Sequence, residues 1–267
     1  MTTKTVLFVH GNFVNHECWN RWIDRFESKG YKCIAPDYPG RDKSVAELRR
    51  LHPDPKAGLL TFEQTLDHFT NIINKLDEKP IIMGHSFGGL LTQNLVKRDL
   101  AAAAVAVDSV PPPGVLSTRF SFYRSLFPIL NPLTPASKPW LMPFSHFQYT
   151  FTNGMTLDEQ KRAYDEIIVP ESITLARGGL TSPAKIDFKK PHAPLLMIGG
   201  EIDNIMPASL NKTNYNRYKA GSSSVVAYKE FPGRNHYTVI AGKGWEEVAD
   251  YALNWAVDQV GAIRIAA

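Results

Sequence analysis

The feature that most constrains the fold is an alternation, along most of the chain, of short apolar runs with longer stretches of helical periodicity. The apolar runs show almost no polar alternation, which is typical of strands covered by helices on both faces and hence of a parallel sheet. The runs are 5–10, 32–36, 80–83, 103–107, 194–198 and 225–231. Strands that alternate with helices in this way predict a doubly wound, mostly parallel α/β sheet.

Helices are expected where apolar residues recur three or four positions apart, as they do in 19–26, 62–76 and 245–255. Two helix starts carry a capping box, in which side chains satisfy backbone N–H groups that have no partner in the first turn. The two boxes pair Thr61 with Gln64 and Thr156 with Glu159.

The middle of the chain breaks the alternation. Between 111 and 191 there is no clear strand, prolines are frequent and aromatic residues are dense. A structureless loop of this length is unusual inside a compact domain, so this stretch is predicted to be a helical insertion that forms a lid. The remaining segments, 1–110 and 192–267, are predicted to form one α/β core, which suits a chain of 267 residues.

Composition excludes several classes of protein. Hydrophobic residues make up 43% and charged residues 21%, as in a globular protein and unlike a disordered one. The net charge of +4 is too small and too dispersed for a nucleic-acid surface. Cys18 and Cys33 suit neither a disulfide framework nor a zinc site, and the N-terminal residues do not resemble a signal peptide. We therefore expect a soluble cytoplasmic protein with no nucleic-acid or membrane partner, whose oligomeric state the sequence does not indicate.

The segment 84–89, Gly-His-Ser-Phe-Gly-Gly, lies between an apolar run and the helical stretch 90–96. A serine with a glycine two residues away on each side can occupy a strained turn from strand to helix, because small neighbours let the backbone pack closely. An ordinary glycine-rich turn with a capping serine fits this sequence motif about as well as a nucleophile turn does. The strand before the segment and the helix after it favour Ser86 as a nucleophile.

A serine nucleophile needs a histidine as base and a carboxylate that orients the histidine. Asp203 comes just beyond the fifth apolar run, and His236 follows the sixth. Both are thus expected at the carboxyl ends of strands, where catalytic groups gather in such sheets. Asp108, after the fourth run, and Glu201 are competing carboxylates. We favour Asp203 because it lies between a strand end and a helix that begins with proline.

The same edge of the sheet offers donors for a negatively charged oxygen. Gly11 lets the chain turn sharply after the first run, so the backbone N–H of Asn12 or Phe13 can point toward Ser86. Together with the N–H of Phe87, at the start of the following helix, this predicts an oxyanion hole.

These motifs resemble the α/β-hydrolase superfamily, in particular its lidded esterases and cofactor-free haloperoxidase-like members. The resemblance covers the chain outside 111–191 and implies that Ser86, Asp203 and His236 are nucleophile, acid and base. We expect the antiparallel strands that begin the superfamily's sheet to be absent, because the first apolar run is the one that carries His10 and Gly11. Haloalkane dehalogenases and epoxide hydrolases are also similar, but they use an aspartate where this chain has Ser86. The matching segments are 8–11, 37–40, 84–89, 199–207 and the loop around His236, and 16–19 loosely resembles plant methyl esterases and hydroxynitrile lyases.

Aromatic residues of the insertion are expected to form an apolar pocket above the nucleophile, suited to an acyl or aryl group of modest size. The resulting interpretation is a serine hydrolase that cleaves a carboxylic ester of a small, largely apolar substrate through an acyl-enzyme. Two alternatives stay open: carbon–carbon bond hydrolysis or perhydrolysis on the same triad, and a small-molecule receptor with a slow triad. The candidate pocket residues are Phe120, Tyr123, Phe127, Trp140, Phe144 and Phe147.

No metal or cofactor is expected, because the sequence has neither a His-Glu-x-x-His pattern nor a phosphate-binding glycine loop. His10 and His85 are interpreted as residues that pack beside the site. A basic cluster is interpreted as a solvated loop, although it can also steer an anionic substrate. Its members are Arg41, Lys43, Arg49 and Arg50.

Overall fold

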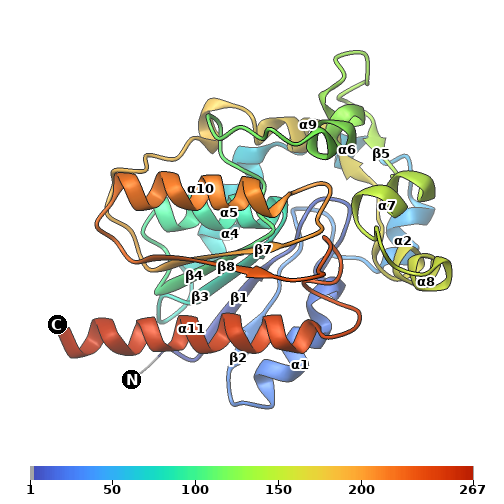
Figure 1. Ribbon diagram of the computed structural model, residues 1–267. Helices are drawn as coiled ribbons and strands as arrows, with labels where there is room; N and C mark the ends of the chain where they lie inside the picture. The colour runs from blue at the N-terminus through green and yellow to red at the C-terminus, as the bar shows by residue number, and fades with distance from the viewer. Residues whose placement is uncertain (1–2, 267) are drawn as a thin grey trace.

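The computed structural model describes residues 3–266, and the side chains of its last helix as far as residue 262. Six strands form one parallel sheet in the order β2-β1-β3-β4-β7-β8 (Figure 1). Each of the six corresponds to one of the apolar runs, so the predicted doubly wound parallel sheet is confirmed. The strands are β1 (Thr5–Val9), β2 (Lys32–Ile34), β3 (Ile81–His85), β4 (Ala103–Val107), β7 (Leu195–Gly200) and β8 (Val226–Phe231).

Helices cover both faces of the sheet, with α1 and α11 on one face and α4, α5 and α10 on the other (Figure 1). Successive side chains of a strand point to opposite faces, so the sheet has two apolar cores. In β1, Val6 and Phe8 join the core under α1 and α11, whereas Leu7 and Val9 join the core under α4 and α5. The bounds are α1 (Asn20–Glu27), α4 (Phe62–Ile73), α5 (Phe87–Lys97), α10 (Ala208–Gly221) and α11 (Trp245–Ala266), and no helix within residues 3–266 combines the length and apolar character of a membrane span.

The segment between β4 and β7 contains several helices, as expected, joined by long irregular stretches, and lies beyond one end of the sheet (Figure 1). It also contains two short strands that the sequence pattern did not indicate, which pair antiparallel through Pro139 with Ser172 and Trp140 with Glu171. Its role as a lid stays a prediction. Its elements are α6 (Phe120–Leu130), β5 (Pro139–Trp140), α7 (Phe144–Thr150), α8 (Leu157–Ile167), β6 (Glu171–Ser172), α9 (Ile173–Gly178) and the 3-10 helix η2 (Ser182–Ala184).

Local signals at the helix starts act as the sequence indicates. The hydroxyls of Thr61 and Thr156 accept from the backbone N–H of Gln64 and Glu159, and both capping boxes are complete. The loops after β1 and β2 carry three further short helices. These are the 3-10 helix η1 (His16–Trp19), α2 (Val45–Arg50) and α3 (Pro55–Gly58).

Candidate active site

Ser86 occupies the turn between β3 and α5 with φ of 57° and ψ of −120°, a conformation that a residue with a side chain rarely adopts. Three backbone hydrogen bonds hold the turn. The N–H of Ser86 donates to the carbonyl of Val107 at 2.9 Å, and its carbonyl accepts from Gly89 at 2.9 Å and from Val110 at 3.0 Å. Such strain is typical of functional turns and exposes the side chain at the edge of the sheet.

The glycines on either side of Ser86 are needed for close packing of backbone on backbone. A Cβ at Gly84 would lie 2.2 Å from the carbonyl oxygen of Gly88, and a Cβ at Gly88 would lie 2.1 Å from the carbonyl oxygen of Val9. Both distances are far below van der Waals contact. The motif therefore specifies how closely α5 approaches the end of β1.

Asp203 and His236, which follow β7 and β8, are brought together by the sheet. The Nδ1 atom of His236 lies 2.5 Å from Oδ2 of Asp203, and both side chains are fully buried. Because a carboxylate accepts, Nδ1 carries the proton, which leaves the lone pair on Nε2. The other oxygen of Asp203 accepts from the N–H groups of Ile205 at 2.7 Å and Met206 at 2.8 Å.

The Nε2 atom of His236 is buried and has no hydrogen-bond partner among the described residues. No hydrogen bond joins it to Ser86, whose residue is 5% exposed. The imidazole is held between two rings, with His85 at 4.4 Å and Phe151 at 4.7 Å between centroids. Catalytic hydrogen bonds in sites without substrate are often long and tighten only when substrate binds.

The two histidines that were expected to pack beside the site are buried there. The Nε2 of His85 donates to the carbonyl of His236 at 3.0 Å, and His10 stacks on Tyr38 at 3.9 Å. Burial lowers the pKa of His10 to about 3 and holds the pKa of His85 well below its ordinary value. Both rings are therefore neutral at pH 7.

The predicted oxyanion donors differ in what they contact. The N–H of Phe13 is directed away from such a role, because it donates to Oε2 of Glu171 at 3.3 Å. Phe13 has φ of 68°, so the chain is sharply turned there. Phe87 is the first residue of α5, where an N–H has no partner within the helix. This geometry favours Asn12 over Phe13 as the second donor.

Glu171 is a buried residue of this edge that sequence reasoning missed. Its Oε1 lies 2.6 Å from Nη1 of Arg41, and the two side chains are 0% and 2% exposed. Arg41 is therefore not part of a solvated loop, as the sequence interpretation held. Arg49 of the same basic cluster also has protein partners, since its guanidinium donates to the carbonyls of Ile168 and Tyr164 in the insertion. Arg41 and Arg49 thus bind the insertion to the core.

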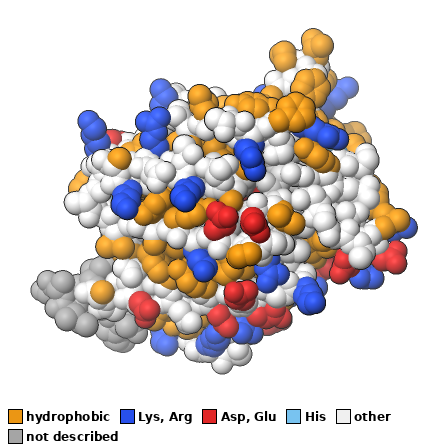
Figure 2. All heavy atoms as spheres, viewed as in Figure 1, with side chains coloured by type: hydrophobic (Ala, Val, Ile, Leu, Met, Phe, Trp, Pro, Cys, Tyr) orange, Lys and Arg blue, Asp and Glu red, His pale blue; other side chains and the backbone are white. Residues whose placement is uncertain are grey.

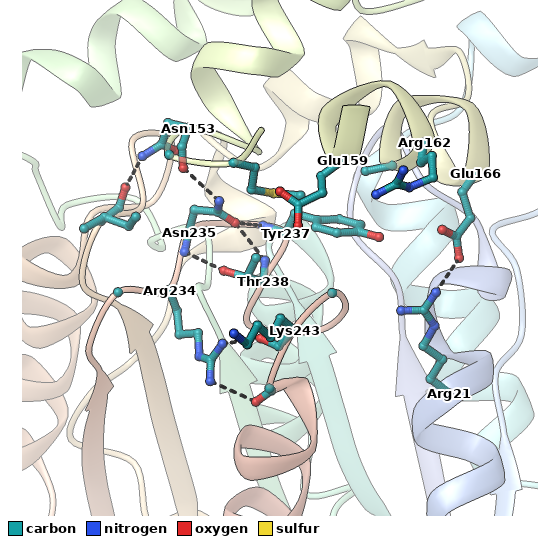
Figure 3. Close-up of a pocket in the computed structure, with 17 residues that line it drawn as sticks. Arg21, Asn153, Glu159, Arg162, Glu166, Arg234, Asn235, Tyr237, Thr238 and Lys243 are labelled. Atoms are coloured by element: carbon teal, nitrogen blue, oxygen red, sulfur yellow. Dashed lines mark hydrogen bonds and ion pairs between the residues drawn. The ribbon is translucent and has the colours of Figure 1, made fainter. Parts of the chain in front are cut away.

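A second missed feature is the link that the insertion makes to the two loops carrying Asp203 and His236 (Figure 3). The side chain of Asn153 donates to the carbonyl of Ile202 at 2.7 Å, and the backbone carbonyl of Asn153 accepts from the side chain of Asn235 at 2.9 Å. These contacts line a cavity of about 600 Å³ on the outer side of the His236 loop. Asn153 thus joins residues adjacent to the acid and to the base.

The six aromatic residues expected to line a pocket differ in exposure, and the pocket itself stays a prediction. On α6, Phe120, Tyr123 and Phe127 are 76%, 46% and 61% exposed, because the helix packs through the opposite face. Figure 2 shows apolar side chains on the surface of this end of the molecule. These three residues therefore do not line an enclosed pocket. The other three lie deeper: Phe147 is fully buried, Trp140 contacts Phe13 at 5.4 Å between centroids, and Phe144 packs on Tyr164.

One group of side chains has the composition of a metal site. His85, Asp108 and His236 each bring a possible ligand atom to within 4.8 Å of the others. Both histidines already use one nitrogen for a protein acceptor, the carbonyl of His236 and the carboxylate of Asp203. A metal ion here would need the His236 ring that Asp203 orients.

Comparison with known proteins identifies the family and finds solved structures with a similar fold. Residues 6–251 match the model of the Alpha/beta hydrolase family. Solved structures with a similar fold include polyneuridine aldehyde esterase (18% identity, 95% of this chain and 99% of that one, TM-score 0.66). They also include the monoacylglycerol lipase of Paleococcus ferrophilus (20%, 97% and 96%, 0.67) and an extracellular alpha/beta-hydrolase from a Paenibacillus species (19%, 94% and 98%, 0.68). At these identities the likeness establishes the fold alone, whereas the family match spans most of the chain. The chain belongs to the alpha/beta hydrolase family.

Proposed function

We propose that this protein is a serine hydrolase that cleaves carboxylic esters of small, largely apolar substrates through an acyl-enzyme. The observation that carries the proposal is the buried Asp203–His236 pair, whose free Nε2 lies at the same sheet edge as the strained turn of Ser86. A histidine held in one tautomer by a carboxylate is the base that a serine nucleophile requires.

In the proposed reaction, the oxygen of Ser86 attacks the ester carbonyl while Nε2 of His236 takes the hydroxyl proton. The N–H groups of Phe87 and Asn12 stabilise the charge on the carbonyl oxygen. When the tetrahedral intermediate collapses, the protonated imidazole gives its proton to the departing alcohol. A water molecule then attacks the acyl-enzyme with His236 as base, which releases the acid and restores Ser86.

The surroundings of the site support an apolar substrate of modest size. Phe13, Phe87 and Phe151 are each 2% exposed and lie beside the residues proposed for catalysis. Among the structures of similar fold are proteins named an esterase, a methylesterase from Arabidopsis and pyrethroid hydrolases. Their names guide the choice of esters for a first panel.

The proposal is tested with p-nitrophenyl esters of graded acyl length and with a fluorophosphonate, which forms a covalent bond to an activated serine. We expect turnover that falls as the acyl chain lengthens, together with one label per chain on Ser86. Ser86→Ala should abolish both while the circular dichroism spectrum stays unchanged. Ser28→Ala, at an exposed serine after α1, is the matched control and should retain both.

Three outcomes contradict the proposal. Turnover by Ser86→Ala equal to that of the parent protein would exclude Ser86 as the nucleophile. Labelling of Ser86 with no turnover of any ester would favour the receptor interpretation, and release of acid from β-diketones in place of esters would favour carbon–carbon bond hydrolysis.

A further inference from the structure

Two buried carboxyl groups, those of Asp108 and Asp203, lie close to the ring of His236. Asp108, which follows β4, is 0% exposed and adopts φ of 41°, a strained value for a residue other than glycine. Its Oδ1 accepts from the N–H of Gly200 at 2.7 Å, and its carboxyl lies within 4.8 Å of a ring nitrogen of His236, the residue that Asp203 contacts. Its Oδ2 is buried with no N–H or O–H donor from the described residues. Two ionised carboxylates in this arrangement would repel each other without water to screen them.

The donors around the pair indicate which carboxyl carries a proton. Asp203 receives two backbone N–H groups and Nδ1–H of His236, whereas Asp108 receives only the N–H of Gly200. Hydrogen bonds to a carboxylate favour its charged form, so the charge belongs on Asp203 and the proton on Asp108. Burial, and then the neighbouring Asp203, raise the pKa of Asp108 well above its ordinary value. When Oδ2 of Asp108 carries this proton, Oδ2 no longer needs a donor, because it donates a hydrogen bond itself.

We propose that Asp108 is a positioning residue, a neutral carboxylic acid whose Oδ2–H donates to the Asp203 carboxylate and so fixes that carboxylate against His236. This inference rests on the proposed function only in giving His236 the role of base. The strained backbone at Asp108 supports it, because the strain aims the side chain into the pair instead of toward solvent.

The titratable groups that face Asp108 come from three other strands or their loops. They are Asp203 after β7, His236 after β8, His85 at the end of β3 and Tyr228 in β8. Burial keeps the pKa of His85 well below, and that of Tyr228 well above, their ordinary values, so both stay neutral near pH 7. His85 and Tyr228 therefore add no charge beside Asp108 near neutral pH.

The protonation state is tested by infrared spectroscopy, which needs no turnover. The difference spectrum between the parent protein and Asp108→Asn at neutral pH should contain the carbonyl band of a protonated carboxylic acid, shifted in deuterium oxide. Asp42→Asn, at a side chain that is 86% exposed, is the control and should lack this band. Absence of the band from the Asp108 difference spectrum would overturn the proposal, whether or not the protein hydrolyses esters.

The positioning role is tested by the pH profile of kcat/KM, whose acidic limb reports deprotonation of the base in the free enzyme. Asp108→Asn keeps a donor toward Asp203 and an acceptor for Gly200, so the limb should stay where it is. If Asp108 were ionised, this substitution would remove a negative charge near the imidazolium and move the limb to lower pH, which would overturn the proposal.

Asp108→Leu provides the opposite test because it removes the donor. Asp203 then keeps more of its negative charge toward His236, so the acidic limb should move to higher pH and kcat should fall about tenfold, as for the loss of one hydrogen bond to a charged group. A fall in kcat with an unmoved limb would mean that Asp108 has only a structural role. If Asp108→Leu does not fold, the two Asp108→Asn measurements decide the matter.

Discussion

Removal of either partner of the buried Arg41–Glu171 pair should destabilise the protein strongly. The two side chains are 2% and 0% exposed and their charged atoms are 2.6 Å apart. Arg41→Met leaves Glu171 with the N–H groups of Phe13 and Ser172 but with no positive charge. Glu171→Gln leaves the guanidinium of Arg41 buried without its paired carboxylate, and its Nε and Nη2 already lack partners among the described residues.

The expected loss follows from the cost of an uncompensated buried charge, which is about 3–5 kcal/mol when one partner of such a pair is removed. For a protein of this size the dependence of unfolding free energy on urea is about 3 kcal/mol per molar. The urea midpoint should therefore fall by about 1–1.7 M in each single variant. Replacement of both residues leaves no uncompensated charge, so Arg41→Met/Glu171→Gln should recover most of the loss.

The assay is urea unfolding followed by tryptophan fluorescence, at two pH values. Burial raises the pKa of Glu171 and Arg41 opposes this rise. Without Arg41, the folded state binds a proton on Glu171 more readily than the unfolded state does. The loss of unfolding free energy in Arg41→Met, relative to the parent protein, should thus be smaller at about pH 5 than at about pH 8. A midpoint for Arg41→Met equal to that of the parent, or a double variant whose loss equals the sum of the two singles, would refute the reasoning.

Three further predictions concern other parts of the fold. Gly88→Ala should lower the yield of folded protein, and its loss of stability should exceed the about 1–3 kcal/mol of ordinary overpacking. The reason is that the added Cβ would lie 2.1 Å from the carbonyl oxygen of Val9. A thermal midpoint equal to the parent's would contradict this. Arg25 holds the pKa of Asp250 far below its ordinary 3.8, so the stability that Asp250 contributes is present above that value and lost as the pH falls below it. Asp250→Asn should be slightly less stable than the parent at neutral pH, by less than about 1 kcal/mol, and equal to it in acid; a deficit in urea unfolding that persists in acid would argue against the ion pair. Asn153→Ala should reduce kcat of ester hydrolysis more than it raises KM, and unchanged kinetics would show that the link to the two loops is dispensable.

Much of the fold is contained in local sequence patterns. The continuous apolar runs identify the six strands because a parallel strand is buried on both faces, and the capping boxes locate two helix starts because they act within one turn. The contact between Asp203 and His236 was also predictable, since the carboxyl ends of parallel strands meet at one edge.

The features that the sequence did not indicate depend on partners far apart in the chain. Arg41 and Glu171 are separated by 130 residues, and a charged residue in a basic cluster gives no local sign that it is buried. Likewise, the aromatic residues of α6 share helical spacing on both faces: Phe122 and Ile129 are buried, whereas Phe120 and Phe127 are exposed. Periodicity shows that a helix has a buried side but cannot identify which side it is when both are apolar.

Asn153 contacts the two loops that carry Asp203 and His236, and these contacts have a consequence for timing. Any outward swing of the insertion that carries Asn153 along breaks the supports next to Asp203 and His236 at once. Under the proposed function, substrate entry by such a movement would not coincide with a supported Asp203–His236 pair, so catalysis would follow the return of the insertion.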